Sequence, residues 1–190
     1  MLVMTPVISL APLNAADHAA ALQAVYQATP HFWEMYGLPT APAGQAIRDL
    51  DEVAQTPGRY LLGIIRRIEP ANAQAGGELI GLADFRLNWP EERIAYLGML
   101  MVAERYQRQG VGLQAWRLLA PWLAEAAGIQ TVRLGVEQFN PGALLFFQKA
   151  GFTLTGGSSR IGVGSKWVRL LYMEQSLKQS SPADVHSTTE

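Results

Sequence analysis

The sequence has no cysteine, no excess of basic residues and no metal-ligand spacing, and each absence excludes a class of protein. Without cysteine, the chain can form no disulfide framework, no cysteine nucleophile and no thiolate metal site. A formal net charge of −1 gives no broad basic field, so we expect no nucleic-acid partner. The three histidines, His18, His31 and His186, are too dispersed for a metal site, so we expect no metal.

Long apolar runs are also missing near the start of the chain. No basic segment is present there, and Pro6, Pro12 and Asn14 interrupt the apolar residues. This pattern predicts neither a signal peptide nor a transmembrane helix, so we expect a cytoplasmic protein without a membrane partner. A length of 190 residues with 49% hydrophobic content suits one domain, which we place at residues 1–177. Residues 178–190 have almost no apolar side chains and are typical of a disordered tail.

Turn residues and hydrophobic periodicity predict an α/β chain in the order strand, helices, three strands, helix, strand, helix, two strands. The three consecutive strands between residues 60 and 102 indicate an antiparallel meander. Pro121 lies inside a predicted helix and predicts a kink or an early end there. The predicted strands are 7–13, 60–67, 78–87, 93–102, 131–139, 152–156 and 166–177, the predicted helices are 15–28, 45–56, 111–128 and 141–150, and 31–44 is a loop or short helix.

Two glycines, Gly110 and Gly112, suggest a phosphate-binding loop, because glycine lets another molecule approach the backbone closely. Together with Ala115 they satisfy the dinucleotide pattern G-x-G-x-x-G/A. That fold needs a strand that runs almost into the first glycine, but the residues AERYQRQ intervene after Val102. The P-loop is excluded too, because the chain has no Gly-Lys pair. A loop without any ligand remains an alternative.

Two spaced motifs resemble those of the GNAT acetyltransferase superfamily. Gln107, Gly110 and Gly112 resemble its Q/R-x-x-G-x-G/A loop, with Val102 and Tyr106 in the positions of its V-x-P-x-Y lead-in. The resemblance implies an α/β fold with a mixed, mostly antiparallel central sheet of about six to seven strands and about four flanking helices. The second motif, about thirty residues later, resembles N-x-x-A-x-x-F-Y-x-K-x-G-F and comprises Asn140, Ala143, Phe146, Lys149, Gly151 and Phe152.

Three positions depart from the family patterns. Glu104 replaces the usual Pro of the lead-in, and Arg108 replaces the Gly that is common beside the loop arginine. Phe147 replaces the Tyr that often serves as general acid, so that role does not carry over to this chain. We expect the nearby Arg105 to be a solvated surface cation rather than a phosphate ligand.

The resemblance implies that acetyl-CoA is the cofactor and co-substrate. Its pyrophosphate would bind the backbone amides of residues 108–112, at the positive end of a helix that starts at Gly110. Its pantetheine arm would pair with the exposed backbone of the strand that ends at Val102. The predicted cofactor-binding residues are Leu100, Met101, Val102, Gln107, Arg108, Gln109, Gly110, Val111, Gly112, Asn140, Phe147 and Lys149.

The resemblance also predicts an N-acetyltransferase that moves the acetyl group to an amine of a small molecule or peptide in a ternary complex. Such an amine needs a general base, because an alkylammonium has a pKa of about 10.4. The catalytic candidates are Glu137, at the end of a strand, and Tyr96, which alternation places on the same face as Val102. Asp84 on the neighbouring strand is a third candidate. A non-catalytic acyl-CoA sensor or interaction module on the same fold is the alternative.

Aromatic residues provide the information on the acceptor. Phe32, Trp33, Tyr36 and Trp89 suggest an apolar or amphipathic acceptor molecule. The apolar strand near residues 167–173 is compatible with a homodimer, and equally with a well-packed edge of the sheet.

Overall fold

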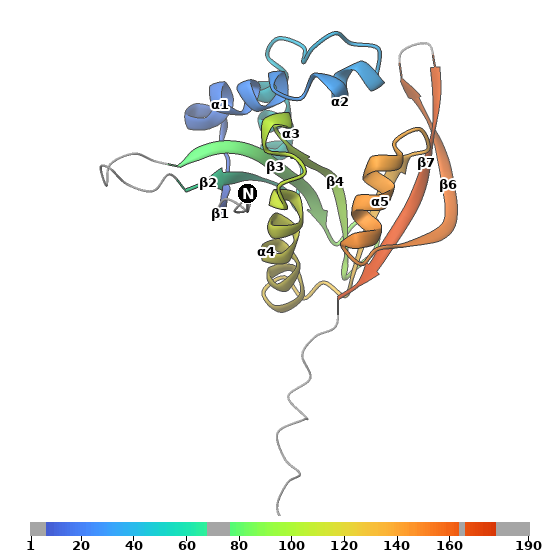
Figure 1. Ribbon diagram of the computed structural model, residues 1–190. Coiled ribbons are helices and arrows are strands. Elements are labelled where there is room, and N and C mark those ends of the chain that lie inside the picture. The colour runs from blue at the N-terminus through green and yellow to red at the C-terminus, as the bar shows by residue number, and fades with distance from the viewer. Residues whose placement is uncertain (1–6, 68–76, 164–165, 178–190) are drawn as a thin grey trace, which may run out of the picture.

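The computed structural model describes residues 7–67, 77–163 and 166–177, which form the elements drawn in Figure 1. The predicted tail 178–190 lies outside the described residues, as does most of the predicted turn between the second and third strands. The strands are β1 (Ile8–Pro12), β2 (Arg59–Arg66), β3 (Glu78–Leu87), β4 (Ile94–Val102), β5 (Thr131–Glu137), β6 (Thr153–Val163) and β7 (Lys166–Ser176). The helices are α1 (Ala15–Gln27), α2 (Pro30–Met35), α3 (Gln45–Gln55), α4 (Val111–Glu125) and α5 (Pro141–Lys149), with a 3-10 turn η1 (Glu104–Tyr106).

All seven strands belong to one sheet in the order β1-β2-β3-β4-β5-β7-β6. Strands β4 and β5 pair in parallel, and the other neighbouring pairs are antiparallel. The predicted α/β fold with a mixed, mostly antiparallel sheet is therefore confirmed, as is the β2-β3-β4 meander. Helix α2 adds a fifth helix, which begins at Pro30 and extends into the segment 31–44 that is predicted as a loop or short helix.

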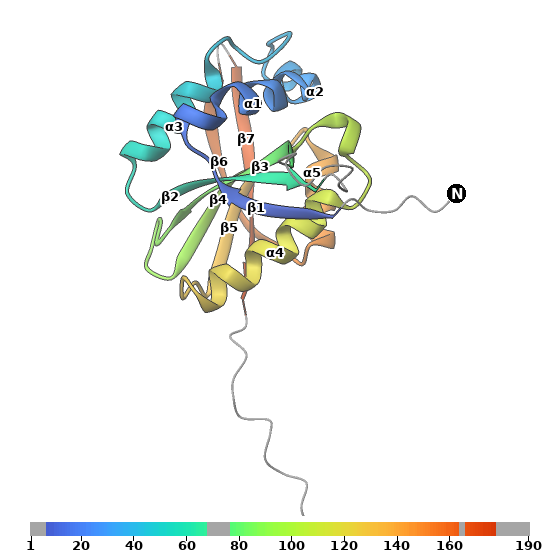
Figure 2. The same cartoon turned by 90° about the vertical axis from the view of Figure 1, so that its left-hand side faces the viewer.

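Helices cover both faces of the sheet, as Figures 1 and 2 show. On one face, α1 and α3 pack on β2 and β3 through a cluster that includes Leu22, Leu50 and Leu82. On the other face, α4 packs on β4 and β5 through a cluster that includes Leu119 and Leu134. Burying each such side chain contributes about 1.5–3 kcal/mol, so these two clusters hold the layers together. In the described part of the chain, no helix is long and apolar enough to cross a membrane.

Side-chain caps set the starts of α1 and α5 where the sequence predicts them. The side-chain oxygen of Asn14 accepts a hydrogen bond from the N–H of Asp17 at 2.9 Å. The side-chain oxygen of Asn140 accepts one from the N–H of Ala143 at 3.1 Å. Gly151, with a φ of +99°, follows the end of α5 in the left-handed region that favours glycine. These local signals depend on residues only three or four positions apart, which is why the sequence reveals them.

Two details differ from the prediction. Of the kink or early end predicted at Pro121, the early end does not occur, and helix α4 continues to Glu125, because buried Leu119 and Leu123 hold both sides of the proline against the sheet. The free-energy cost of the lost backbone hydrogen bond is smaller than the stabilisation that burial of these two side chains contributes. Strand β6 continues through residues predicted as a loop, because its residues 158–163 pair with β7. Pairing with a neighbouring strand outweighs the weak local preference of a Gly- and Ser-rich segment.

Candidate active site

The sheet opens between β4 and β5. Their parallel pairing joins residues 94–97 to residues 131–134, yet β4 continues to Val102 and β5 to Glu137. Beyond Leu97, the backbone of β4 is paired on its β3 side, while its other side faces the opening. Such a strand edge can bind an extended ligand as if the ligand were a further strand.

Alternation along β4 decides which backbone groups face this opening. The N–H of Ala103 donates to the carbonyl of Ile80, just before Gly81 of β3, at 2.8 Å. In an antiparallel ladder, residues bonded to the partner strand alternate with residues that face away from it. Met101, two positions from Ala103, therefore directs its backbone groups to β3. Leu100 and Val102 direct theirs to the opening, so two of the three predicted strand positions have backbone groups there.

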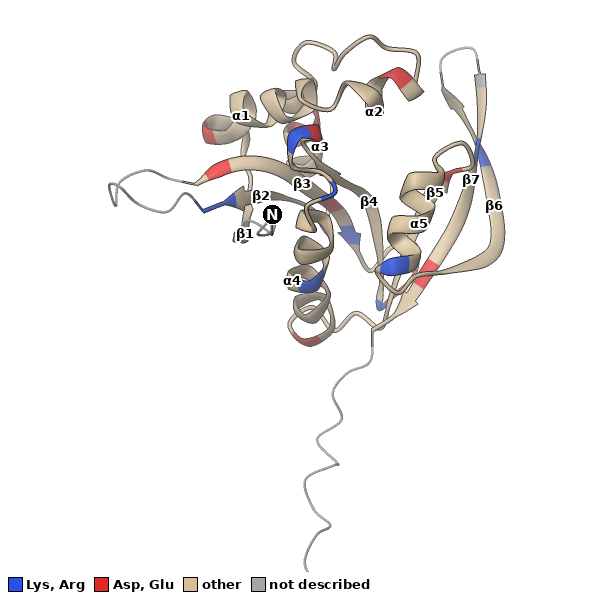
Figure 3. Cartoon of the chain, viewed as in Figure 1, with Lys and Arg blue, Asp and Glu red and all other residues tan. Residues whose placement is uncertain are grey.

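The loop before α4 has the backbone conformation of an anion-binding turn. Arg108 has a φ of +58° and Gly110 a φ of +83°, and α4 starts at the next residue. For the N–H groups of residues 108–112, no hydrogen-bond acceptor is found among the described residues. These donors and the positive end of the α4 dipole suit a phosphate group. Basic residues themselves are spread over several helices and strands (Figure 3), so backbone donors define this site.

Two further residues shape the start of α4. The Nε2 of Gln107 donates to the carbonyl of Val102 at 2.8 Å, which ties the loop to the end of β4. Gly112 leaves room for the ring of Phe146, because an added Cβ would lie 3.2 Å from that ring. This glycine therefore allows α5 to approach the start of α4, which brings the two sequence motifs together.

Glu78 anchors the segment that leads into the loop. Its carboxylate accepts hydrogen bonds from Tyr106 at 2.7 Å and from Arg66, and it pairs with Arg105. Burial raises the pKa of Glu78, but the hydrogen bonds from Tyr106 and Arg66 and the charge of Arg105 outweigh burial, so its pKa is lowered. Both Arg66 and Arg105 also lie over the ring of Tyr106. Arg105 is thus largely solvated, as predicted, but its charge is paired.

Glu104, which replaces the family's usual proline, has a structural role here. One of its carboxylate oxygens accepts a hydrogen bond from the backbone N–H of His31 at 2.9 Å, in the first turn of α2. Its own N–H donates to the carbonyl of Ala28 at 2.9 Å. A proline at this position would lack both groups. Glu104 therefore links the segment before the loop to α2.

The side chains of the second motif lie in different environments. The ring of Phe147 packs edge-on against Phe152, with centroids 5.4 Å apart, and it joins the core under α4. Lys149 is exposed and lines, together with Arg117, a cavity of about 360 Å³ between α4 and α5. Asn140 uses its side-chain oxygen for the α5 cap. Of these predicted cofactor residues, Lys149 is therefore the one with a charge available at the surface.

Glu137 lies at the far end of β5, beside the opening. The hydroxyl of Tyr36, which follows α2, donates to a carboxylate oxygen of Glu137. Burial, then the hydrogen bond to Glu137 and the charge of that residue, raise the pKa of Tyr36 well above its ordinary value. Tyr36 therefore remains a proton donor at neutral pH and holds the carboxylate in place. This contact joins α2 to the end of β5, which are far apart in the sequence.

The predicted face of Tyr96 is wrong, because β4 contains a bulge. Asp84 lies opposite Met99 and Phe85 opposite Leu97, so Gly98 is an extra residue in β4. A bulge reverses the alternation beyond it. Tyr96 therefore lies on the face of the sheet opposite Val102. Glu137 lies on the same face as Tyr96.

Tyr96 lies within the electrostatic range of the Glu137 carboxylate. Burial, and then the neighbouring Tyr172 and Glu137, raise the pKa of Tyr96. Its hydroxyl lies 3.0 Å from the position that a Cβ on Gly135 would occupy. As a protonated hydroxyl, Tyr96 can orient an acceptor or a water but does not serve as a base near neutral pH.

Asp84, the third candidate base, is committed to another interaction. Its carboxylate accepts three hydrogen bonds from Arg59, the shortest of them at 2.6 Å. Of the aromatic residues suggested for the acceptor, Trp33 is buried in the core with α1 and Phe32 packs against it.

The sequence did not point to three residues that line a cavity in the structure, namely Tyr172, Arg133 and Glu174. The one signal for them in the sequence is their alternation with buried residues on β5 and β7.

The comparisons with known proteins agree with this geometry. An acetyltransferase from Thermus thermophilus has 25% sequence identity and a TM-score of 0.68, over 92% of this chain and 99% of that one. A probable GNAT-family acetyltransferase from Chromobacterium violaceum has 19% identity and a TM-score of 0.73, over 89% and 82% of the two chains. A spermidine N-acetyltransferase from Vibrio cholerae, in complex with CoA and spermine, has 13% identity and a TM-score of 0.68, over 90% and 95%. No protein with a curated description matches the chain.

The fold and the loop together define the class of this protein. It is an α/β protein whose central sheet opens beside a helix N-terminus that suits an anion. Residues 23–152, more than half of the chain, match the acetyltransferase (GNAT) family. The chain is therefore a member of the GNAT acetyltransferase family, and the structural neighbours share its fold. Proteins of this family use acetyl-CoA as acyl donor.

Proposed function

We propose that this chain transfers an acetyl group from acetyl-CoA to an amine of a small molecule or peptide, by direct attack in a ternary complex. The observation that supports this most is the opening between β4 and β5, which has the anion-binding loop on one side and Glu137 on the other. Phosphate-binding donors and a carboxylate beside one opening suit a ligand that spans from the loop to the site of chemistry.

Acetyl-CoA supplies an activated acyl group in the form of a thioester. The lone pair of the neutral amine forms a bond from nitrogen to the carbonyl carbon, and the carbon–sulfur bond breaks. The sulfur leaves with the bonding electron pair and takes up one proton, while the nitrogen loses one. The products are an amide and a free thiol, so atoms and charges balance.

The main barrier that the chain must lower is the protonation of the amine. With a pKa of about 10.4, roughly one amine molecule in a few thousand is neutral at pH 7, which is a penalty of about 4–5 kcal/mol. A general base contributes about 10²–10⁴-fold to the rate. Glu137 is our candidate for this base, directly or through a water, because Tyr36 fixes its carboxylate at the end of β5.

The leaving group needs less assistance. A thiol with a pKa of about 8.5 leaves as a thiolate readily, so Phe147 in the position of the family's tyrosine is compatible with turnover. The charge that develops on the carbonyl oxygen requires a fixed N–H donor. Leu100 and Val102 direct their N–H groups to the opening and are our candidates for that donor.

The test is to measure CoA binding by calorimetry and thiol release from acetyl-CoA with a panel of amines. The panel should include monoamines, a peptide with a free N-terminus and spermine, since spermine is bound by the Vibrio cholerae neighbour. We expect CoA binding and acceptor-dependent thiol release. CoA binding without turnover on any amine would favour the sensor alternative, and a failure to bind CoA would contradict both.

A further inference from the structure

Helix α2 contacts both the segment before the anion-binding loop and the candidate base. In Figure 1, α2 crosses the space between α1 and the β6–β7 hairpin. At its start, the N–H of His31 donates to a carboxylate oxygen of Glu104 at 2.9 Å. After its end, the hydroxyl of Tyr36 donates to the carboxylate of Glu137. These hydrogen bonds join residues 73 and 101 positions apart in the chain, so tertiary packing alone brings them together.

Trp33 anchors the middle of α2 to the core. Its Nε1 donates to the carbonyl of Tyr26 on α1 at 2.8 Å, and its ring meets the ring of Tyr26 edge-on. This anchor fixes the position of so short a helix but leaves it free to turn about the indole. The contact with Glu104 at the start of α2 and the contact with Glu137 after its end therefore set the direction of the helix.

Tyr36 is the donor that fixes the Glu137 side chain. Among the described residues, no other group donates a hydrogen bond to that carboxylate. A side chain without such a partner exchanges between several staggered rotamers. Removal of the Tyr36 hydroxyl would therefore keep the negative charge of Glu137 but release its orientation.

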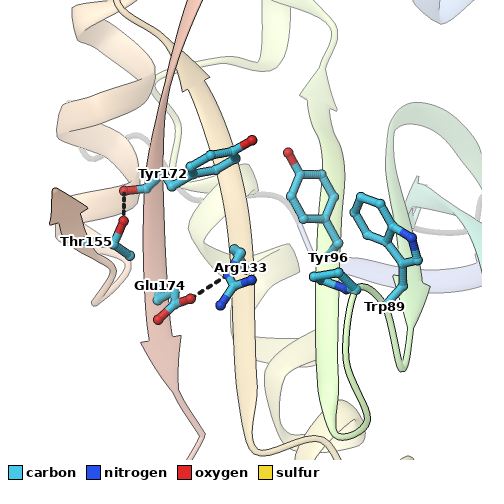
Figure 4. A pocket seen from close by; sticks show the side chains of 7 residues that line it. Trp89, Tyr96, Arg133, Thr155, Tyr172 and Glu174 are labelled. Atoms are coloured by element: carbon cyan, nitrogen blue, oxygen red, sulfur yellow. Dashed lines mark hydrogen bonds and ion pairs between the residues drawn. The ribbon is translucent and has the colours of Figure 1, made fainter. Parts of the chain in front are cut away.

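The other tyrosines on this face do not hold the carboxylate. Tyr96 and Tyr172 line one cavity of about 390 Å³, as Figure 4 shows. The hydroxyl of Tyr172 donates to Ser159 Oγ at 2.9 Å. The hydroxyl of Tyr96 lies over Gly135, and among the described contacts no hydrogen bond joins it to Glu137. The direction of the Glu137 carboxylate therefore depends on α2.

Glu104 lies in η1, directly before the loop that we propose to bind the pyrophosphate. That loop has other ties to the fold. Gln107 Nε2 donates to the carbonyl of Val102, and the hydroxyl of Tyr106 donates to Glu78. Loss of the Glu104 side chain should therefore affect α2 more than it affects the loop.

We propose that Glu104 is a positioning residue for acetyl transfer, which acts through α2 and Tyr36 on the carboxylate of Glu137. This inference rests on the proposed function and adds to it a link between the two sides of the opening. The Glu104 carboxylate holds the start of α2, and α2 carries the Tyr36 hydroxyl to the end of β5. A proline at position 104 has no carboxylate, so this departure from the family pattern gives the chain a contact that the usual residue cannot make.

Hydrogen–deuterium exchange tests the contact itself, without any substrate. Glu104→Ala should speed the exchange of the backbone amides of residues 31–36 about 5-fold, because it removes the acceptor of the His31 N–H. Glu104→Gln should keep the wild-type exchange rate, because its amide oxygen can accept the same hydrogen bond. Unchanged exchange in the alanine variant would overturn the proposal, whichever amine is the acceptor.

Turnover tests the consequence for the base, at saturating acetyl-CoA and with the fastest amine among ethylamine, a peptide with a free N-terminus and spermine. Tyr36→Phe and Glu104→Ala should each lower kcat about 10-fold and leave CoA affinity nearly unchanged. Glu104→Gln should keep the wild-type kcat. The double variant Tyr36→Phe, Glu104→Ala should also lose only about 10-fold, because both changes release the same carboxylate. An additive loss of about 100-fold, or equal losses in the alanine and glutamine variants, would overturn the proposal.

The matched control is Tyr26→Phe. The hydroxyl of Tyr26 also donates to a carboxylate, that of Asp49 at 2.7 Å, but between α1 and α3. This variant should lower stability and keep the wild-type kcat, and a loss equal to that of Tyr36→Phe would overturn the proposal. A wild-type kcat in Tyr36→Phe beside a slow Glu137→Gln would overturn the role of α2 alone. A chain that acetylates none of the amines would instead contradict the proposed function, and the exchange rates would still test the contact.

Discussion

Residues 100–112, which we propose to bind the cofactor, offer backbone N–H and carbonyl groups from one continuous stretch of chain. The side of the opening that we propose for the acceptor instead collects side chains from distant elements, with Tyr36 after α2, Tyr96 on β4, Glu137 on β5 and Tyr172 on β7. A site made of backbone depends on local conformation, so it tolerates many side chains but few changes of glycine. A site made of side chains depends on packing and on residue identity. Substitutions should therefore separate the two sides.

The largest effect on cofactor binding is expected at Gly110. A Gly110→Val substitution should weaken CoA binding at least about 100-fold, because a β-branched residue strains the left-handed conformation by about 1–2 kcal/mol and intrudes among the N–H donors. Gly128→Val is the matched control, since Gly128 also has a positive φ of +67° and lies in open space beyond α4. Both variants should lose similar stability in thermal unfolding. Equal CoA affinity of the two variants in calorimetry would contradict the phosphate role of the loop.

The next effect is expected at Glu137. A Glu137→Gln substitution should lower kcat/KM by about 10²–10⁴-fold at neutral pH and leave CoA affinity unchanged, because it removes the base and not a phosphate contact. Its residual rate should rise with pH, since more of the amine is then neutral without help. Glu125→Gln, at the exposed end of α4, is the control and should keep the full rate. A wild-type rate in the Glu137 variant would assign the base elsewhere.

The smallest effect is expected at Glu78. A Glu78→Gln substitution should reduce the free energy of unfolding by about 1 kcal/mol and weaken CoA binding only a few-fold, because this carboxylate holds the loop indirectly. The pKa of Glu78 is lowered in the folded chain, so its stabilisation is present above the ordinary glutamate pKa and disappears as the pH falls through the lowered value. The difference from wild type in chemical unfolding should therefore be present at pH 7 and much smaller at pH 3.

The control for Glu78 is Glu52→Gln, which also removes a carboxylate from an arginine, at 3.1 Å, but far from the loop. It should lower stability without changing CoA affinity. If the two variants bind CoA equally well, Glu78 stabilises the fold without positioning the loop.

Most of the fold is predictable from the sequence, and the failures have identifiable causes. The starts of α1 and α5 follow from neighbouring residues, so they are predicted correctly, and Asn14 and Asn140 cap them in the structure. Whether α4 ends at Pro121 or continues across it is not decided by the local sequence, because the outcome depends on burial against the sheet. The extension of β6 depends in the same way on pairing with β7.

The same distinction applies to the candidate site. The loop residues lie where the motif predicts them, and Glu137 lies beside the opening. Alternation predicts the wrong face for Tyr96, because the extra residue at Gly98 reverses alternation without any strong local signal. From the sequence Asp84 is a reasonable candidate, but in the structure its carboxylate pairs with Arg59. Roles for the catalytic residues remain predictions until the variants are measured.

By itself, the sequence determined the order of the elements, the helix caps and the loop that begins α4. These features depend on residues within a few positions of one another, whose conformational preferences act locally. Only the tertiary structure decided where β4 and β5 separate, which face Tyr96 occupies, and that Trp89, Tyr172 and Arg133 enclose one cavity. Those features arise from packing and strand pairing between residues far apart in the chain, and no local preference encodes them.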